Sequence, residues 1–190
     1  MSDLSGIGIL IVEDSQAMMR LVGSVLKSMG VKRIYTAPEG ERGFRVFQSE
    51  KPDIVITDWL MDNGMDGITF MQKVRQDKLS VDRTVPIIMM SGYSARKRVI
   101  QARDAGVTEF LAKPFTAEEL GKRITYVVER PRDFIECDTF VGPDRRRRVD
   151  PYYKGPSRRD DDVQEHMTTQ IYKKKAASDD KNESSDIRLK

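Results

Sequence analysis

The stretch Asp53-Ile54-Val55-Ile56-Thr57-Asp58 is a short, mostly apolar run that ends in a carboxylate. Four other short runs are similarly rich in Ile and Val: Ile7–Val12, Arg33–Thr36, Pro86–Met90 and Val107–Leu111. Such runs are typical of strands that are buried in a parallel sheet. A carboxylate at the end of a buried strand is costly without a partner charge, so Asp58 predicts a polar site.

Amphipathic segments separate these runs. A helix is predicted from near Ser15, because the apolar positions then fall on one face: Met18, Val22, Val25 and Met29. Other helices are expected from Pro38 to about Glu50, after Gly67, from about Ser94 to Asp104, and from a capping-box sequence at Thr116 to Pro131. Successive β-then-α units predict an α/β fold, a doubly wound five-stranded parallel sheet with helices on both faces.

Polar residues stand at or just past the carboxyl ends of four of the predicted strands. They are Asp14, Asp58, Ser91 and Lys113, and Glu13 directly precedes Asp14. In open parallel sheets, ligands bind beyond the carboxyl ends of the strands. We therefore expect an acidic pair, a lone acid, a hydroxyl and a lysine to form one site.

This set of side chains predicts a magnesium site. Mg²⁺ prefers oxygen ligands and usually takes one or two carboxylates while it keeps several waters. Asp14 and Asp58 can supply the carboxylates, and Glu13 can act through a bound water. The backbone carbonyl of Leu60 is expected to complete the set, with Mn²⁺ as the alternative ion.

The same residues predict phosphoryl transfer to Asp58. A bound cation offsets charge on the transferred oxygens, so the Asp58 carboxylate can attack a phosphoryl donor in line. Lys113 adds a second cation, and Ser91 can donate a hydrogen bond to the phosphoryl oxygens. Taken singly, these residues also fit a helix cap, a turn and a solvated lysine. Their combination at the strand ends favours the site.

Four stretches carry a resemblance to a known family: Ile9-Leu10-Ile11-Val12-Glu13-Asp14, Asp53-Ile54-Val55-Ile56-Thr57-Asp58, Pro86-Ile87-Ile88-Met89-Met90-Ser91-Gly92 and Asp104-Ala105-Gly106-Val107-Thr108-Glu109-Phe110-Leu111-Ala112-Lys113-Pro114-Phe115. Over residues 6–130 the chain resembles the receiver domain of two-component response regulators, the CheY-like family. The resemblance implies a flavodoxin-like fold with Asp58 as phospho-acceptor and a cis proline after Lys113. It also implies that Glu13 and Asp14 are the acidic pair, Ser91 the switch hydroxyl and Phe110 the switch aromatic.

The resemblance also implies how the protein would work. It would be a signalling protein rather than an enzyme: a single-domain response regulator of a bacterial phosphorelay that catalyses only its own phosphorylation and dephosphorylation. A histidine kinase or a phosphotransfer protein would supply the phosphoryl group. Once Ser91 and Phe110 have moved, a downstream protein would bind the face formed by the fourth helix, the fifth strand and the fifth helix.

The sequence departs from the receiver pattern in two places. The run Trp59-Leu60-Met61-Asp62-Asn63-Gly64-Met65-Asp66-Gly67 has Asp62 in place of the usual proline and one extra residue, which predicts a longer, more acidic and more mobile loop. Phe110 has no hydroxyl, so inward motion would gain burial without a hydrogen bond. In addition, Leu60 and Tyr93 stand two positions past site residues and predict slow self-dephosphorylation, because apolar or bulky groups there hinder the hydrolytic water.

Residues 131–190 differ in character from residues 6–130. Apolar residues are sparse, and charges occur in blocks: Arg145–Arg148, Asp160–Asp162 and Lys173–Lys175. Such a segment buries too little apolar surface to offset its ordering entropy. We predict a largely disordered tail with no output domain and, at most, a short helix near Val163 to Lys175. His166, the single histidine, is expected to be incidental.

The tail leaves a second function open. Arg145–Arg148 have tyrosines and further arginines nearby and could bind an anionic partner such as a nucleic acid, a nucleotide or a membrane surface. A net charge of +3 is too small to indicate nucleic-acid binding by itself. The simpler interpretation of the tail is a solvated linker.

Two other classes of protein on a similar sheet are disfavoured. An aspartate-nucleophile phosphatase typically needs a second acid two residues beyond the nucleophile, where this chain has Leu60. A flavin-binding module needs a phosphate-cradling loop after the first strand, where Glu13-Asp14 would repel phosphate.

The remaining signals predict a cytoplasmic protein. No stretch approaches the ~20 apolar residues of a membrane span. Residues 1–6 lack the basic region and the apolar core of a secretory signal. The single cysteine, Cys137, cannot form an internal disulfide.

Overall fold

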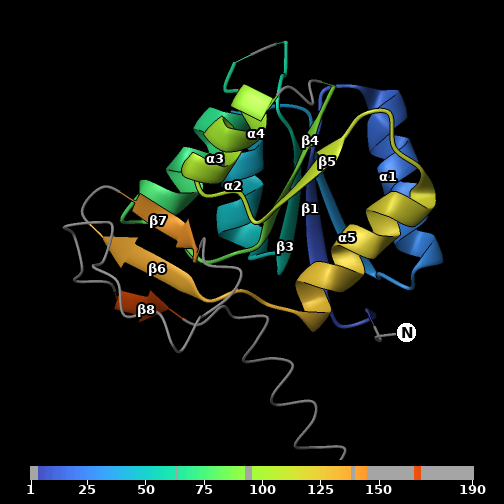
Figure 1. Ribbon diagram of the computed structural model, residues 1–190. Coiled ribbons are helices and arrows are strands. Elements are labelled where there is room, and N and C mark those ends of the chain that lie inside the picture. The colour runs from blue at the N-terminus through green and yellow to red at the C-terminus, as the bar shows by residue number, and fades with distance from the viewer. Residues whose placement is uncertain (1–3, 63, 93–95, 138–139, 145–164, 168–190) are drawn as a thin grey trace, which may run out of the picture.

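The computed structural model describes residues 4–62, 64–92, 96–137, 140–144 and 165–167. Its main body is the predicted five-stranded parallel sheet with helices on both faces (Figure 1). The strands are β1 (Gly8–Val12), β2 (Arg33–Ala37), β3 (Ile54–Asp58), β4 (Ile87–Ser91) and β5 (Glu109–Ala112), in the order β2-β1-β3-β4-β5. This is the flavodoxin-like order, whose switch point lies between β1 and β3.

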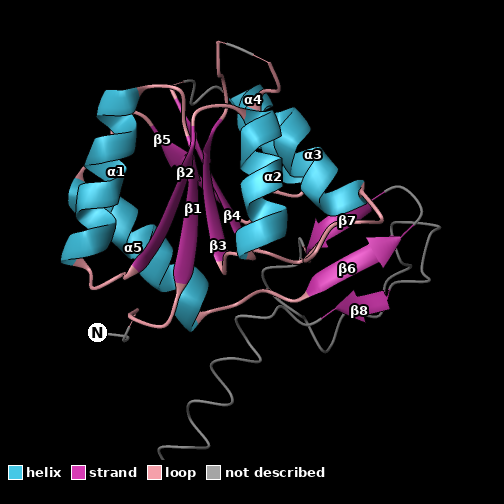
Figure 2. Ribbon diagram, turned by 180° about the vertical axis from the view of Figure 1, so that it is seen from behind, coloured by secondary structure: helices cyan, strands magenta, loops and turns pink. Residues whose placement is uncertain are grey.

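The helices form a layer on each face of the sheet (Figure 2). One layer holds α1 (Gln16–Ser28) and α5 (Ala117–Glu129), and the other holds α2 (Gly40–Glu50), α3 (Gly67–Gln76) and α4 (Arg96–Asp104). Among the described residues, none of these helices combines the length and the apolar character that a membrane span requires.

The central strands are apolar on both sides because both sides are covered. In β1, Ile9 and Ile11 pack toward α1 and α5, whereas Leu10 and Val12 pack toward α2 and α3. All four side chains are fully buried. Burial on both faces explains why the predicted strands read as continuous apolar runs rather than as an alternating pattern.

Local signals set where the helices begin. Ser15 caps α1 and Asp66 caps α3, each by accepting a hydrogen bond from a backbone N–H. Thr116 opens the predicted capping box of α5. Helix α2 begins at Gly40 and not at Pro38 as predicted, because the chain stays extended through the N-cap residue.

The turn between α4 and β5 makes the fifth strand begin later in the sequence than predicted. Gly106 N donates to Arg103 O at 3.1 Å, and Val107 N donates to Ala102 O at 3.1 Å. These two bonds form the double turn that commonly ends a helix, with Gly106 in the left-handed conformation at a φ of 98°. The strand therefore begins at Glu109 rather than at the predicted Val107.

Part of the C-terminal segment forms a second, antiparallel sheet. Its strands are β6 (Phe134–Cys137), β7 (Phe140–Pro143) and β8 (Glu165–Met167), in the order β7-β6-β8. The sequence does not predict these strands, and β8 lies where the sequence predicts a short helix. The sequence predicts disorder over residues 131–190, and the three strands correct that prediction for residues 134–137, 140–143 and 165–167. The rest of the prediction, with the anionic partner expected at Arg145–Arg148, falls on residues 138–139, 145–164 and 168–190, which lie outside the described residues.

Apolar side chains hold the second sheet against the main body. Phe134 is fully buried, and Ile135 and Val141 are nearly so. The sheet lies beside α3, and its contacts include the α3–β4 and α4–β5 connections (Figure 1). These connections precede strands, so the second sheet lies at the amino ends of the strands, away from the predicted site.

Candidate functional site

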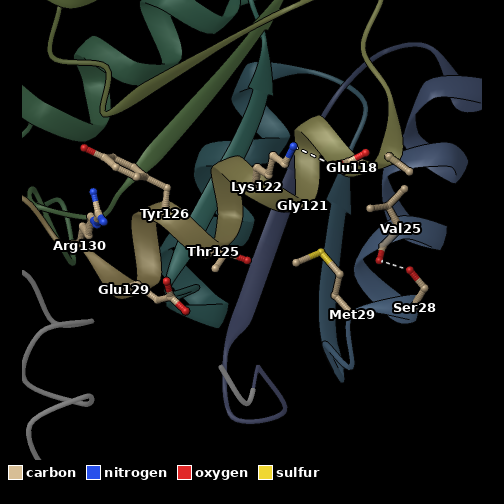
Figure 3. A pocket seen from close by; sticks show the side chains of 11 residues that line it. Val25, Ser28, Met29, Glu118, Gly121, Lys122, Thr125, Tyr126, Glu129 and Arg130 are labelled. Atoms are coloured by element: carbon tan, nitrogen blue, oxygen red, sulfur yellow. Dashed lines mark hydrogen bonds and ion pairs between the residues drawn. The ribbon is translucent and has the colours of Figure 1, made fainter. Parts of the chain in front are cut away.

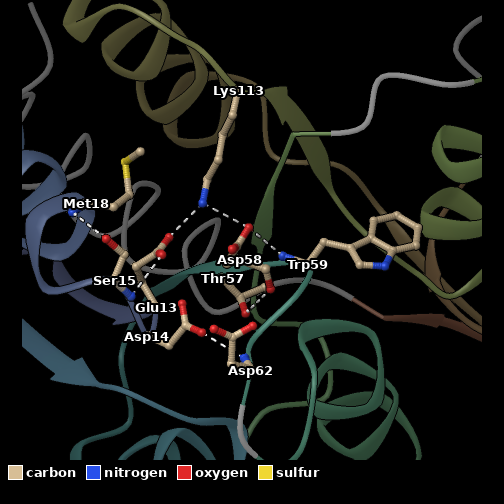
Figure 4. Close-up of polar contacts among 9 residues, drawn as sticks. All are labelled: Glu13, Asp14, Ser15, Met18, Thr57, Asp58, Trp59, Asp62 and Lys113. Atoms are coloured by element: carbon tan, nitrogen blue, oxygen red, sulfur yellow. Dashed lines mark hydrogen bonds and ion pairs between the residues drawn. The ribbon is translucent and has the colours of Figure 1, made fainter.

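The predicted acids and the lysine gather where β1, β3 and β5 end (Figure 4). Glu13 and Asp14 follow β1, Asp58 is the last residue of β3, and Lys113 follows β5. The parallel register accounts for this arrangement, because Val12 pairs with the residue that precedes Asp58. The four side chains therefore lie at one edge of the sheet, and their roles in a site stay a prediction.

Lys113 lies between two carboxylates. Its Nζ is 2.9 Å from Glu13 Oε2 and 3.0 Å from Asp58 Oδ1. The Glu13 side chain is 1% exposed and that of Asp58 is 13% exposed, so salt screens these ion pairs less than it screens surface pairs. The other oxygen of Glu13, Oε1, accepts a hydrogen bond from Ser15 N at 3.2 Å.

Backbone N–H groups orient the two aspartates. Trp59 N donates to Asp58 Oδ1 at 2.8 Å, and Asp62 N donates to Asp14 Oδ2 at 2.7 Å. Both donors belong to the loop that follows β3. The orientation of each carboxylate is thus restricted before a ligand arrives, which reduces the reorganisation that a reaction would require.

Burial raises the pKa of Glu13 and of Asp58 above the usual carboxyl range. The hydrogen bond and the charge of Lys113 lower both pKa values, but the loss of hydration is the larger effect at each residue. The Asp14 charge raises the pKa of Asp58 further. The site therefore holds its negative charge at an energetic cost, which a bound cation would offset.

Asp58→Asn should stabilise the metal-free protein at neutral pH. Because the folded-state pKa of Asp58 is raised, folding free energy is lost as the pH rises from the unfolded-state pKa, and the loss is complete once the pH exceeds the folded-state pKa. Below the pKa of the same carboxyl in the unfolded chain, about 4, both states are protonated and this cost is absent. Urea unfolding in EDTA measures the effect: the variant's advantage should shrink as the pH falls, and an advantage that is independent of pH contradicts the prediction.

The donor set fits a hard divalent cation. Glu13, Asp14 and Asp58 each offer a carboxylate oxygen, and these oxygens lie within 4.8 Å of one another. Carboxylate oxygens suit Mg²⁺ and Mn²⁺ better than they suit softer metals. The Leu60 side chain is 46% exposed in the adjoining loop, and its carbonyl as a further ligand stays a prediction.

The two predicted switch residues lie on β4 and β5. Ser91 ends β4 with its side chain buried, and its backbone carbonyl accepts a hydrogen bond from Lys113 N at 2.7 Å. Phe110 is half-buried on β5, and its ring meets the Trp59 ring edge-on with centroids 6.5 Å apart. Because Trp59 N also contacts Asp58, the switch aromatic is one side chain away from the proposed acceptor.

The acidic loop after β3 is attached to α2. Glu41, in the first turn of α2, accepts a hydrogen bond from Met65 N at 3.0 Å, and Gly40 N donates to Met65 O at 3.2 Å. The bond from Met65 lowers the pKa of Glu41. Sequence reasoning missed Glu41, whose place at a helix N-terminus has an ordinary explanation. Asn63 lies outside the described residues, so the mobility of the loop stays a prediction.

Gly67 is a second residue that sequence reasoning missed. Its N–H donates to Trp59 O at 3.0 Å, and a Cβ at this position would lie 1.8 Å from Asp58 O. Only glycine allows two backbone segments to approach this closely. The first residue of α3 therefore supports the backbone that carries Asp58.

A separate hollow of about 560 Å³ lies between α1 and α5 (Figure 3). Val25 of α1 and Met29, the residue that caps its C-terminus, line one side, and Gly121 and Tyr126 line the other from α5. None of the predicted site residues lines this hollow. The chemistry that the sequence predicts therefore belongs to the sheet edge and not to the groove between these helices.

A flavodoxin-like sheet with an acidic pair after β1, an acid that ends β3 and a lysine after β5 defines a receiver-type domain. Comparison with known proteins agrees. Residues 9–125 match the family described as the response regulator receiver domain. The chain belongs to this family, and the match ends before β6 begins.

Individual relatives cover the same region. The chain is 34% identical over 122 residues to chemotaxis protein CheY of Pseudomonas aeruginosa, covering 64% of this chain and 96% of that protein. It is 36% identical over 133 residues to the KDP operon transcriptional regulatory protein KdpE of Escherichia coli, covering 70% of this chain and 56% of that protein. Among solved structures, the chemotaxis response regulator CheY4 of Vibrio cholerae has a TM-score of 0.58 at 27% identity, covering 64% of this chain and 98% of that one.

Proposed function

We propose that this protein is a response regulator whose Asp58 accepts a phosphoryl group in a two-component phosphorelay. The observation that best supports this function is the position of the Asp58 carboxylate. It lies 3.0 Å from Lys113 Nζ and beside the acidic pair Glu13 and Asp14, at the carboxyl edge of the sheet. The family relationship makes a histidine kinase or a phosphotransfer protein the proposed donor.

The transfer can be written with the groups that the site supplies. A carboxylate oxygen of Asp58 forms a bond to phosphorus while the bond from phosphorus to the donor breaks. The donor, a histidine nitrogen or a carboxylate such as acetate, leaves with the electron pair. Lys113 is placed to stabilise negative charge on the oxygens around phosphorus.

Glu13, Asp14 and Asp58 would hold the divalent cation, for which their oxygens are suitably close. When bound, Mg²⁺ would neutralise the charge that develops on the phosphoryl oxygens. The chain's own part is to gather three acids that repel one another and to hold them with Lys113 and with backbone N–H groups. Ser91, at the end of β4, would donate a hydrogen bond to the phosphoryl group once it is attached.

The proposed output is binding to a protein on the face formed by α4, β5 and α5. Phe110 lies on β5, and its ring contacts Trp59, whose N–H contacts Asp58. A phosphoryl group on Asp58 would favour a packing that improves its own contacts, and the partner would bind that packing. Signalling rather than substrate turnover is proposed, because Leu60 supplies no acid at the position where a phosphatase would need one.

Labelling by a small acyl phosphate tests this function. Incubation with acetyl phosphate and Mg²⁺ should add one phosphoryl group, and the modified peptide should contain Asp58. EDTA should prevent the addition, and Asp58→Asn should remain unmodified. Labelling that persists in EDTA or in the variant, or an intact wild-type mass that never changes, would refute the assignment.

A further inference from the structure

We propose that the C-terminal strands act as an internal clamp on the connection between α4 and β5 and oppose the rearrangement of the switch strand. The C-terminal clamp consists of β6, β7 and the flanking residues Arg132 and Asp144. The contacts themselves do not depend on phosphorylation. The effect on the switch rests on the proposed function of Asp58.

The clamp and the α4–β5 turn meet backbone against backbone. A Cβ added at Gly106 would lie 2.7 Å from Val141 O, and a Cβ added at Gly142 would lie 2.9 Å from Gly106 Cα. Neither distance is sterically tolerable, so a glycine is needed on each side of the contact. Because Gly106 belongs to the turn that ends α4, the clamp contacts the chain at the connection from α4 to β5.

A buried arginine joins the clamp to the same turn. Arg75 of α3 is 1% exposed, and its Nε donates to Gly106 O at 3.2 Å while its Nη1 donates to Arg83 O at 2.8 Å. Its guanidinium carbon lies 4.9 Å from the centroid of the Phe134 ring, within range of a cation–π interaction. Burial lowers the pKa of Arg75 to about 9, which leaves the side chain charged at neutral pH. The arginine therefore connects α3, the turn and β6.

Two further arginines secure the edges of the clamp. Arg83 Nη1 is 2.6 Å from Glu136 Oε1 on β6, and this pair is partly buried. Arg132 Nη1 donates to Thr108 O at 3.5 Å, and its Nη2 donates to Asp144 O. Arg132 thus reaches from the clamp to the last residue before β5.

The clamped residues directly precede the switch aromatic. Gly106 and Thr108 stand four and two positions before Phe110, in the turn that leads directly into β5. Rearrangement of β5 toward a phosphorylated packing would have to move this segment relative to the clamp. A contact that is stronger in one packing shifts the equilibrium toward that packing, and the shift is reciprocal with ligand binding at the other site. Loosening the clamp should therefore tighten the binding of a phosphoryl mimic at Asp58.

Arg132→Gln in the full chain tests the proposal, with Arg130→Gln as the matched control. Arg130 is exposed, and its guanidinium lies over the exposed Tyr126 ring of α5 at 5.7 Å. A second variant, Gly142→Ala, disturbs the glycine contact by a different route. Hydrogen exchange of the peptide spanning residues 104–112 reports on the clamped segment. Titration with beryllofluoride in Mg²⁺, followed through the single tryptophan Trp59, reports on binding at Asp58.

The expected result is faster exchange in residues 104–112 and about fivefold tighter beryllofluoride binding in Arg132→Gln, with the control like wild type. If hydrogen exchange of residues 104–112 in Arg132→Gln equals that of wild type, the proposal is wrong. It is also wrong if exchange is faster but beryllofluoride binds equally or more weakly. If wild type itself binds no beryllofluoride, the proposed function fails, and the exchange result still decides whether the clamp exists. If Gly142→Ala does not fold, Arg132→Gln still carries both measurements.

Discussion

Lys113→Met should take up a phosphoryl group from acetyl phosphate about 10²–10³-fold more slowly than wild type, because the loss of one preorganised stabilising group typically costs that factor. Methionine keeps much of the side-chain length but removes the charge that lies 3.0 Å from Asp58 Oδ1. Glu13 loses the same partner at 2.9 Å. The two buried carboxylates then repel each other without an intervening cation, so the pKa of each should rise further.

Lys122→Met is the matched control for this prediction. Lys122 is 71% exposed and pairs with Glu118 one helical turn away, a surface ion pair that water and salt screen. Its labelling rate should equal that of wild type. The measurement is the initial rate of phosphoryl incorporation at saturating Mg²⁺, and a Lys113→Met rate within about twofold of wild type would remove Lys113 from the mechanism.

Gly67→Ala should lose about 3 kcal/mol of unfolding free energy and most of its capacity for labelling. The added Cβ would lie 1.8 Å from Asp58 O and 3.0 Å from Thr57 Oγ1. The obstructing atom is backbone rather than the flexible end of a side chain. The end of β3 must therefore move, and the Asp58 carboxylate moves with it.

Gly23→Ala supplies a control with the opposite sign. Gly23 lies inside α1, and a Cβ there would have no neighbour within 4 Å. Replacing an unobstructed glycine in a helix interior should raise stability by about 0.5–1 kcal/mol. Urea unfolding of both variants measures the two effects. Equal stabilities for Gly67→Ala and wild type would show that β3 accommodates the added methyl group.

Sequence reasoning could bring the candidate site residues together because parallel topology places strand ends side by side. Asp14, Asp58 and Lys113 come from distant parts of the chain, yet each follows or ends an apolar run. Once the runs are assigned to one parallel sheet, their carboxyl ends share an edge whatever the loops do. The chemistry of the side chains then restricts what that edge can bind.

Contacts that depend on the route of a loop could not be predicted in this way. Glu41 accepts from Met65 N, and Gly67 approaches Asp58 O, only because of the route that the acidic loop takes back to α3. Neither residue has an unusual local pattern. An acid in a first helical turn and a glycine at a helix start are both common without any role in a site.

The C-terminal strands could not be predicted because the composition of a segment does not show what the segment packs against. Residues 131–144 hold too few apolar side chains to form a core of their own. Phe134, Ile135 and Val141 instead complete a surface that the main body already offers. A strand that packs against the core of the main body needs only a few apolar residues. An average over the composition of the whole segment does not reveal these few residues.

The burial of Arg75 determines where this protein can be shortened. A chain that stopped at Arg130, the last residue of the α5 region, would look like a complete receiver by sequence. That shortened chain would, however, lack Phe134, whose ring contacts the Arg75 guanidinium. It would also lack β7, which covers Gly106, so Gly106 would face solvent. A shortened form intended for crystallisation or NMR should extend at least to Asp144, whose N–H donates to Asp133 O and closes the β6–β7 pair.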